Sequence, residues 1–140
     1  MVTLLDEKII LLKNQSKHHI EVATTTEMKL RELHNYLIDN NVKKGVAIDC
    51  MCGLGALGIY LLKFGFEKVI FNDINPEMVE ALKKNLELNN ISEGFEIYNK
   101  SFEDLNIDHL DFCVIDAFPG SDINDVIVKA KKLADNGLII

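Results

Sequence analysis

The chain has 140 residues, of which 48% are hydrophobic and 26% are charged, and its formal net charge is −7. This length and apolar content predict one folded domain with a core and exclude a disordered chain. The sequence has no run of about 18 apolar residues that could span a membrane, and its acidic balance provides no obvious basic face for holding nucleic acid.

The charge is divided unevenly along the chain. Residues 1–46 carry 7 basic and 6 acidic side chains, whereas residues 47–140 carry 8 basic and 16 acidic ones. A nucleic-acid substrate would therefore need a local basic patch or the help of a partner. The three cysteines do not form a disulfide framework, so we expect a reducing, cytoplasmic setting. They are more simply small buried hydrophobic residues than metal ligands, and we predict no metal site.

Residues 1–44 are predicted to form a helical extension that packs on the rest of the chain. Residues 3–14 combine helix-like apolar spacing with charges, and residues 18–22 fit a short strand or an extended arm. Threonines at 24–26 can cap a helix that runs to about Asn40. The apolar stripe of this helix is formed by Met28, Leu30, Leu33, Leu37 and Ile38.

The stretch of residues 46–76 predicts half of a nucleotide-binding βαβ unit. A short apolar run that ends in Asp49 is typical of a buried parallel strand with an acid at its carboxyl end. Gly53 and Gly55 allow a tight turn and the close approach of a ligand. The helix predicted over residues 57–64 begins there and offers free N–H groups and a positive dipole end.

A second predicted strand, residues 68–71, leads to another acid. Asp73 follows it 20 residues after Gly53, which is about where such folds place the carboxylate that binds a ribose. Gly65 ends the helix between the two strands. Gly58 lies inside that helix and is predicted to allow close packing of the helix on the strand.

Strands and helices continue to alternate along the rest of the chain. Asn75 can cap a helix that has Pro76 in its first turn. The remaining predicted elements are a strand over 95–98, a loop or single turn over 101–105, a strand over 112–116, a helix over 123–133 with Gly137 just past it, and a strand from 138. This order predicts an α/β fold over residues 45–140, a doubly wound, mostly parallel sheet of about five strands with right-handed crossovers.

Polar residues gather at the carboxyl ends of these predicted strands, where such sheets bind ligands. They are Asp49, Asp73, the loop after Tyr98, and Asp116. Residues 53–58 read G-x-G-x-x-G, which alone suggests NAD as readily as another nucleotide. Three residues separate Asp49 from the first glycine, so the loop is wide and has a carboxylate at its mouth. That carboxylate can hold a cationic amino group, which NAD lacks.

The run Asp-Cys-Met-Cys-Gly-Leu-Gly at 49–55, with Asn-Asp-Ile-Asn-Pro-Glu at 72–77, resembles class I S-adenosylmethionine-dependent methyltransferases, which have a Rossmann-like core. The second run and residues 82–89 behind it are similar to tRNA guanine methyltransferases of the archaeal and eukaryotic type. The resemblance covers about residues 46–140. It implies S-adenosylmethionine as the cofactor and tRNA or another amine as the methyl acceptor.

The resemblance also implies roles for individual residues. Asp73 would bind the ribose hydroxyls, Ile74 would lie against the adenine, and Ser101 would border the base from the other side with its neighbour. The implied cofactor-binding residues are Asp49, Cys50, Met51, Gly53, Gly55, Asp73, Ile74, Ser101 and Phe102. The implied catalytic residues, which face the methyl group and the acceptor, are Asp116, Phe118 and Pro119.

The sequence departs from the superfamily pattern at several positions. Met51 replaces the first loop glycine, Ser101 stands where an acid is common, and residues 116–120 hold the acceptor motif in altered order. The chain ends in the fifth strand, whereas the superfamily sheet adds two more. Its edge would then be bare or covered by a second copy or a partner subunit.

Three rival functions stay open. The chain could be a cofactor-binding subunit that acts through a partner. It could also be an aminopropyltransferase, because residues 114–118 resemble the corresponding strand of polyamine aminopropyltransferases, or an NAD-linked enzyme.

Overall fold

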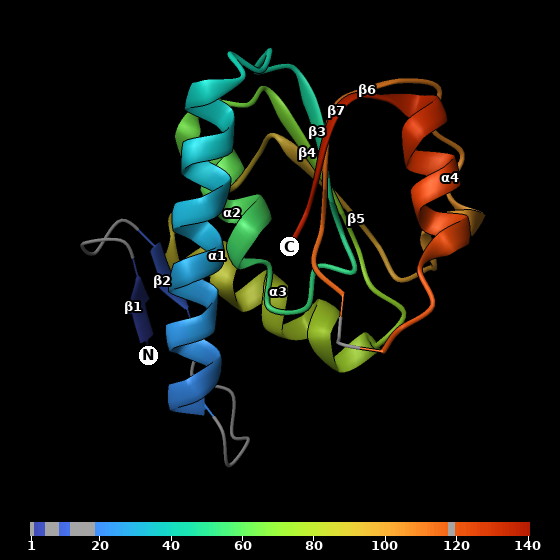
Figure 1. Cartoon of the computed structure of the whole chain (residues 1–140). Helices are drawn as coiled ribbons and strands as arrows, with labels where there is room; N and C mark the ends of the chain where they lie inside the picture. The colour runs from blue at the N-terminus through green and yellow to red at the C-terminus, as the bar shows by residue number, and fades with distance from the viewer. Residues whose placement is uncertain (1, 5–8, 12–18, 118–119) are drawn as a thin grey trace.

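A parallel five-stranded sheet forms the centre of the molecule (Figure 1). The computed structural model describes residues 2–4, 9–11, 19–117 and 120–140. The elements in chain order are β1 (Val2–Leu4), β2 (Ile9–Leu11), α1 (His19–Asp39), β3 (Val46–Cys50), α2 (Ala56–Phe64), β4 (Lys68–Asn72), α3 (Pro76–Leu88), β5 (Phe95–Tyr98), the 3-10 helix η1 (Phe102–Asp104), β6 (Leu110–Ile115), α4 (Asn124–Leu133) and β7 (Ala134–Ile139).

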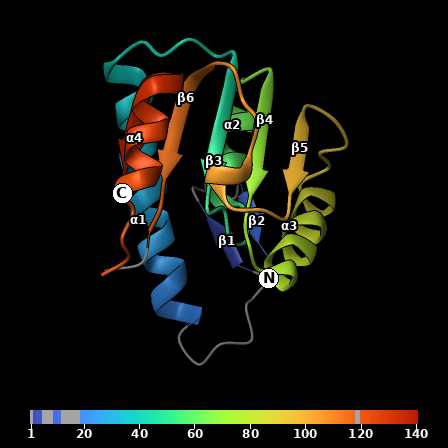
Figure 2. The ribbon, with the colours of Figure 1, turned by 90° about the vertical axis from the view of Figure 1, so that its right-hand side faces the viewer.

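The order of the strands in the sheet is β5-β4-β3-β6-β7, and every neighbouring pair is parallel. Figure 2 shows β5, β4, β3 and β6 side by side. The chain starts this sheet in the middle at β3, extends to one edge, and then crosses to β6 on the other side. The strand order therefore reverses between β3 and β6, where ligands of such sheets bind. The predicted doubly wound α/β fold is confirmed.

Helices cover both faces of the sheet, with α1, α2 and α3 on one face and α4 on the other (Figure 1). The two faces follow from the alternation of side chains along each strand. In β4, Val69 and Phe71 contribute to the core beneath α1–α3, whereas Ile70 belongs to the core beneath η1 and α4. No helix in the described ranges is long and apolar enough to cross a membrane.

The helix predicted to end near Asn40 is present as α1, but the elements predicted over residues 3–22 are wrong wherever the structure describes them. In place of a helix over residues 3–14, β1 and β2 pair as antiparallel strands, with Val2 opposite Leu11. Instead of a strand or an arm at 18–22, helix α1 begins at His19. The buried Leu30 and Leu33 anchor this helix on the core. Extending the helix toward the N-terminus costs only about 0.7 kcal/mol or less per residue in helix propensity. The threonines at 24–26 therefore lie inside the helix and not at its start.

The C-terminal strand is also longer than predicted. It begins at Ala134, directly after α4, and Gly137 lies inside it opposite Cys113. Residues 134–137 are poor strand formers, but their backbone pairs with β6, whose residues are all buried. Tertiary pairing therefore overrides local preference here. The start of α3 is as predicted, because the Asn75 side chain accepts a hydrogen bond from the Glu77 N–H and Pro76 is the first helical residue.

Candidate functional site

Three carboxylates lie together at the carboxyl ends of the central strands, as the sequence predicted. They belong to Asp49 near the end of β3, Asp73 just after β4, and Asp116 just after β6. The pKa of Asp49 is raised well above its ordinary value, first by burial and further by the charges of Asp116 and Asp73, while the Gly58 N–H lowers it. Asp73 and Asp116 therefore lie close enough to Asp49 to raise its pKa.

Asp49 is held under the glycine loop and is not presented to solvent. Its side chain is 1% exposed, and Oδ2 accepts a hydrogen bond of 2.8 Å from the backbone N–H of Gly58 in α2. This bond joins the end of β3 to the first turn of α2. Asp49 thus fixes the loop between them, and a ligand's amino group would meet it only through a rearrangement or an intervening water.

Asp49→Asn is expected to stabilise the protein increasingly as the pH rises. The folded-state pKa of Asp49 lies above the ordinary 3.8. Between pH 3.8 and that higher pKa the folded protein binds more protons than the unfolded chain, so it loses stability as the pH rises through this window. Asparagine cannot ionise but can still accept the Gly58 N–H. We expect its melting temperature at neutral pH to exceed that of the native protein by about 5 °C, and by less in acid.

Thermal denaturation across the acid-to-neutral range measures this difference. Asp108→Asn, which removes one carboxylate at an exposed position, is the matched control. A difference between Asp49→Asn and the native protein that stays constant with pH would count against the destabilising effect assigned to the Asp49 charge.

The loop after β3 is built from left-handed backbone. The φ angles are 55° at Met51, 55° at Gly53 and 86° at Gly55. A Cβ on Gly53 would meet nothing within 4 Å, whereas a Cβ on Gly55 would lie 2.2 Å from Leu82 Cδ1 on α3. Met51, at the position where the sequence resemblance implies a glycine, has a φ that side chains seldom adopt. Gly53 faces open space, and Gly55 allows the loop to pack on α3.

A buried asparagine on α3 also holds this loop. Asn85 is fully buried, and its Nδ2 donates a 2.8 Å hydrogen bond to the carbonyl of Leu54. Asn89, one turn later, donates to the carbonyl of Asn85 at 2.7 Å. The sequence connects residues 82–89 with the site only through the resemblance. The structure shows the physical connection, because Asn85 on α3 holds the glycine loop.

Asp73 connects the tips of β3 and β4. Its Oδ2 accepts a 2.9 Å hydrogen bond from the Gly53 N–H, and its Oδ1 accepts one of 2.9 Å from the Asn75 N–H. Asn99 donates to its backbone carbonyl at 2.9 Å. A carboxylate has about four lone-pair sites, so Asp73 can still accept hydroxyl hydrogens from a ligand. Next to it, the side chain of Ile74 is 73% exposed and offers an apolar surface at the same tip.

The segment after β5 contains the predicted cofactor-binding residues Ser101 and Phe102. Ser101 Oγ donates to Asp104 Oδ2 at 3.0 Å, and Asn72 Nδ2 holds the Lys100 carbonyl at 3.2 Å. The side chain of Phe102 is only 2% exposed and belongs to the core beneath α4. Its predicted place beside the base is therefore available to its backbone but not to its ring.

Lys129 from α4 fastens this segment. Its Nζ donates hydrogen bonds of 2.6 Å to the carbonyls of both Phe102 and Leu105, and it lies 4.8 Å from the centre of the Phe102 ring. Spacing along the sequence gives no sign of this contact, since the two elements are more than 20 residues apart.

Asp116 is paired with a lysine that the sequence did not indicate. Its Oδ1 lies 2.7 Å from Nζ of Lys29, which comes from α1. The two residues are 87 positions apart, so no local pattern connects them. The other predicted catalytic residues, Phe118 and Pro119, lie outside the described residues.

Cys50 and Cys113 are buried, and Cys52 is partly buried. Burial is the main cause that raises the pKa of the Cys50 and Cys52 thiols, and it raises the pKa of Cys113 to about 12. All three therefore stay protonated at neutral pH. The side chain of Cys50 is fully buried, so only its backbone can meet a cofactor. Met51 is partly exposed.

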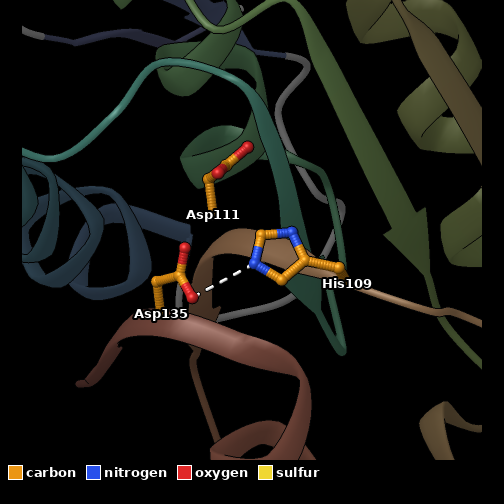
Figure 3. A group of neighbouring side chains, drawn as sticks. All are labelled: His109, Asp111 and Asp135. Atoms are coloured by element: carbon orange, nitrogen blue, oxygen red, sulfur yellow. Dashed lines mark ion pairs between the residues drawn. The ribbon is translucent and has the colours of Figure 1, made fainter.

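A second polar group lies at the opposite ends of the strands (Figure 3). His109 Nε2 is 3.1 Å from Asp135 Oδ1, and one potential ligand atom from each of His109, Asp111 and Asp135 lies within 4.8 Å of the others. Asp111 is buried and accepts a 2.8 Å hydrogen bond from the Val46 N–H. These contacts assign the group a structural role in joining β3, β6 and β7 at the edge away from the carboxyl ends.

Comparison with known proteins identifies the family. The sequence pattern of the ribosomal protein L11 methyltransferase (PrmA) family matches residues 21–131. The chain belongs to the PrmA family. The matched region extends from α1 into α4 and therefore includes the three carboxylates, the glycine loop and Lys29.

Individual PrmA proteins match over shorter stretches. The ribosomal protein L11 methyltransferase of Psychrobacter sp. is 39% identical over 64 residues, which cover 46% of this chain and 21% of that protein. The one of Citrobacter koseri is 40% identical over 74 residues, covering 53% and 24%. The chain thus spans about a fifth to a quarter of the length of these curated relatives. Their names indicate a protein acceptor, whereas the sequence resemblance indicates tRNA guanine methyltransferases.

Solved structures show the same fold. An S-adenosylmethionine-dependent methyltransferase of Leishmania major superposes with a TM-score of 0.68 at 16% identity, covering 91% of this chain and 55% of that one. The tRNA (uracil-54, C5)-methyltransferase of Pyrococcus abyssi, in complex with S-adenosyl-L-homocysteine, gives 0.55 at 23% identity, covering 77% and 26%. At these identities the likeness concerns the fold alone.

Proposed function

We propose that this chain is the S-adenosylmethionine-binding and catalytic part of a methyltransferase that acts on an amine of ribosomal protein L11 or a similar protein. The main support is the PrmA match over residues 21–131, which contains every described residue of the candidate site. The names of the curated relatives favour a protein acceptor.

Each part of the site has a role in this reaction. The cofactor, when bound, supplies a methyl group activated by a positively charged sulfur. The open loop at Gly53 admits the cofactor, Asp73 binds the ribose hydroxyls, and the exposed Ile74 lies against the adenine. Asp116 accepts an N–H of the acceptor amine, which aligns its lone pair and stabilises the charge that develops on nitrogen. The protein thus contributes mainly position and electrostatics.

The charge of the chain favours protein over tRNA as the acceptor. Residues 47–140 carry twice as many acidic as basic side chains, and a tRNA phosphate backbone would be repelled by such a surface. Transfer to tRNA is the second candidate, and it is supported by the resemblance of residues 72–77 to tRNA guanine methyltransferases.

Transfer of a labelled methyl group to purified ribosomal protein L11, to total ribosomal protein and to bulk tRNA tests the proposal. Label in L11 alone would support it, and label in tRNA alone would replace it with the second candidate. Binding of the cofactor product without transfer to any acceptor would favour a cofactor-binding subunit. Calorimetry with decarboxylated S-adenosylmethionine and with NAD tests for an aminopropyltransferase and for an NAD-linked enzyme, and binding of NAD alone would overturn the methyltransferase assignment.

Asp116→Ala is expected to reduce the rate of methyl transfer by about 10²–10³-fold. The affinity for the neutral product S-adenosylhomocysteine should change by less than about threefold, because Asp116 is assigned to the acceptor side and a single lost weak contact has a small effect. Single-turnover rates and calorimetry measure the two quantities. Asp108→Ala, at an exposed position away from the strand tips, is the control. Equal losses of rate and of product affinity would contradict the role given to Asp116.

A further inference from the structure

The ion pair between Lys29 and Asp116 is held by two well-anchored elements. Lys29 directly precedes Leu30 in α1, and Leu30 and Leu33 are fully buried against the sheet. Asp116 directly follows β6, in which all residues are buried. The pair has an N–O distance of 2.7 Å, and its side chains are 27% and 31% exposed. It is therefore partly screened by water.

This pair contributes to the charge balance at the strand tips, where Lys129 holds the neighbouring segment after β5. Asp49 on β3, Asp73 after β4 and Asp116 after β6 bring three carboxyl groups together, and the pKa of Asp49 responds to both of the others. The ion pair of Lys29 involves one of these three carboxylates directly. Other pairs link Lys43 to Asp111, Lys68 to Glu96, Arg31 to Glu27, Lys83 to Glu80 and His109 to Asp135.

The two ligands of the proposed reaction differ in the charge that meets this balance. S-adenosylmethionine carries a positive sulfonium, whereas the product S-adenosylhomocysteine has a neutral thioether and is otherwise the same molecule apart from the methyl group. An unpaired carboxylate near the sulfur would favour the cofactor over the product. It would also stabilise the positive charge of the sulfur before the reaction. Because this charge is lost as the methyl group leaves, such a carboxylate would slow the transfer.

We propose that Lys29 is a specificity-determining residue of the cofactor site, because it neutralises Asp116 and so limits the preference for the charged cofactor over the neutral product. This inference rests on the proposed function, in which Asp116 faces the methyl group. Lys29 thereby keeps Asp116 available to the acceptor amine without letting it hold the sulfonium in the ground state.

The ratio of the dissociation constants of the product and the cofactor, measured by calorimetry at neutral pH, tests the proposal. Lys29→Met leaves Asp116 unpaired and should raise the preference for the cofactor by about three- to tenfold. Asp116→Asn leaves Lys29 unpaired and should lower it by about the same factor. The double variant should return to within about twofold of the native ratio, as a coupled pair requires.

Two further variants separate charge from structure. Lys29→Arg keeps the positive charge and should keep the native ratio, whereas Lys29→Gln should repeat the effect of Lys29→Met and replaces it where that variant folds poorly. Lys43→Met removes the cation beside Asp111, at the other ends of the strands, and is the control. A folded, neutral Lys29 variant with the native ratio would overturn the inference alone. Failure of the native protein to bind either ligand would overturn the proposed function and this inference with it.

Discussion

Gly58→Ala is expected to lower the free energy of unfolding by about 3 kcal/mol, which corresponds to a fall in melting temperature of about 10 °C. A Cβ on Gly58 would lie 2.2 Å from Cε1 and 2.7 Å from Cζ of Phe71. Phe71 is fully buried in β4, so its ring cannot swing into solvent. Either α2 or the ring must shift, in a domain whose whole stability is about 5–15 kcal/mol. Thermal and urea denaturation measure the loss.

The clash itself can be tested with a second substitution. Phe71→Leu in the Gly58→Ala background makes room for the new methyl group, so the double variant should be more stable than the sum of the two single effects predicts, by about 1 kcal/mol or more. Gly120→Ala is the control without a clash, because nothing lies within 4 Å of its added Cβ. Its effect on stability reflects the φ of 84° alone. Strict additivity of the Gly58 and Phe71 changes would show that the loss has another origin.

Asp73→Ala should weaken the binding of S-adenosylhomocysteine by about 10²–10³-fold. The carboxylate is proposed to accept both ribose hydroxyls, and each hydrogen bond to a charged group contributes about 1.5–3 kcal/mol. The substitution also removes the acceptor of the Gly53 and Asn75 N–H groups, which hold the glycine loop against β4. Calorimetry measures the change in affinity, and thermal denaturation shows whether the fold is kept.

A ligand that lacks the ribose hydroxyls distinguishes the two effects of Asp73. The 2′,3′-dideoxy form of the product should bind the native protein far more weakly than the product does, and Asp73→Ala should reduce that difference to nearly nothing. A variant that weakens both ligands by the same factor would mean that Asp73 acts only by shaping the loop. Asp73→Asn keeps one oxygen for the Gly53 N–H, so its affinity for the product should lie between those of the native protein and Asp73→Ala.

The central part of the fold could be predicted because its signals are local. The apolar runs of β3, β4 and β6 end at or just before an acid, and Asn75 with Pro76 marks the start of α3. Parallel strands bring their carboxyl ends to one edge, so these acids were expected to meet. The glycines at 53 and 55 indicated a tight turn, and the structure contains left-handed backbone there.

Other features could not be predicted because several competing local patterns fit the same residues. Residues 9–11 suit a helix as well as a strand, and pairing with residues 2–4 decides for the strand. The threonines at 24–26 resemble a helix start, but the helix begins before them, at His19, because α1 is stabilised by the core on which it packs. The burial of the Phe102 ring also could not be predicted. It depends on how α4 crosses the sheet, which brings Lys129 against the ring.

The sequence by itself determined the order of strands and helices in the central sheet, the glycine loop and the acids at the strand ends, because these depend on short-range periodicity and turn chemistry. Only the tertiary structure decided what each acid contacts. Asp49 is buried against α2, Asp73 bridges two strand tips, and Asp116 meets Lys29 from a helix 87 residues away. The partners of a charge are chosen by packing over long distances in the sequence, and no local pattern records that choice.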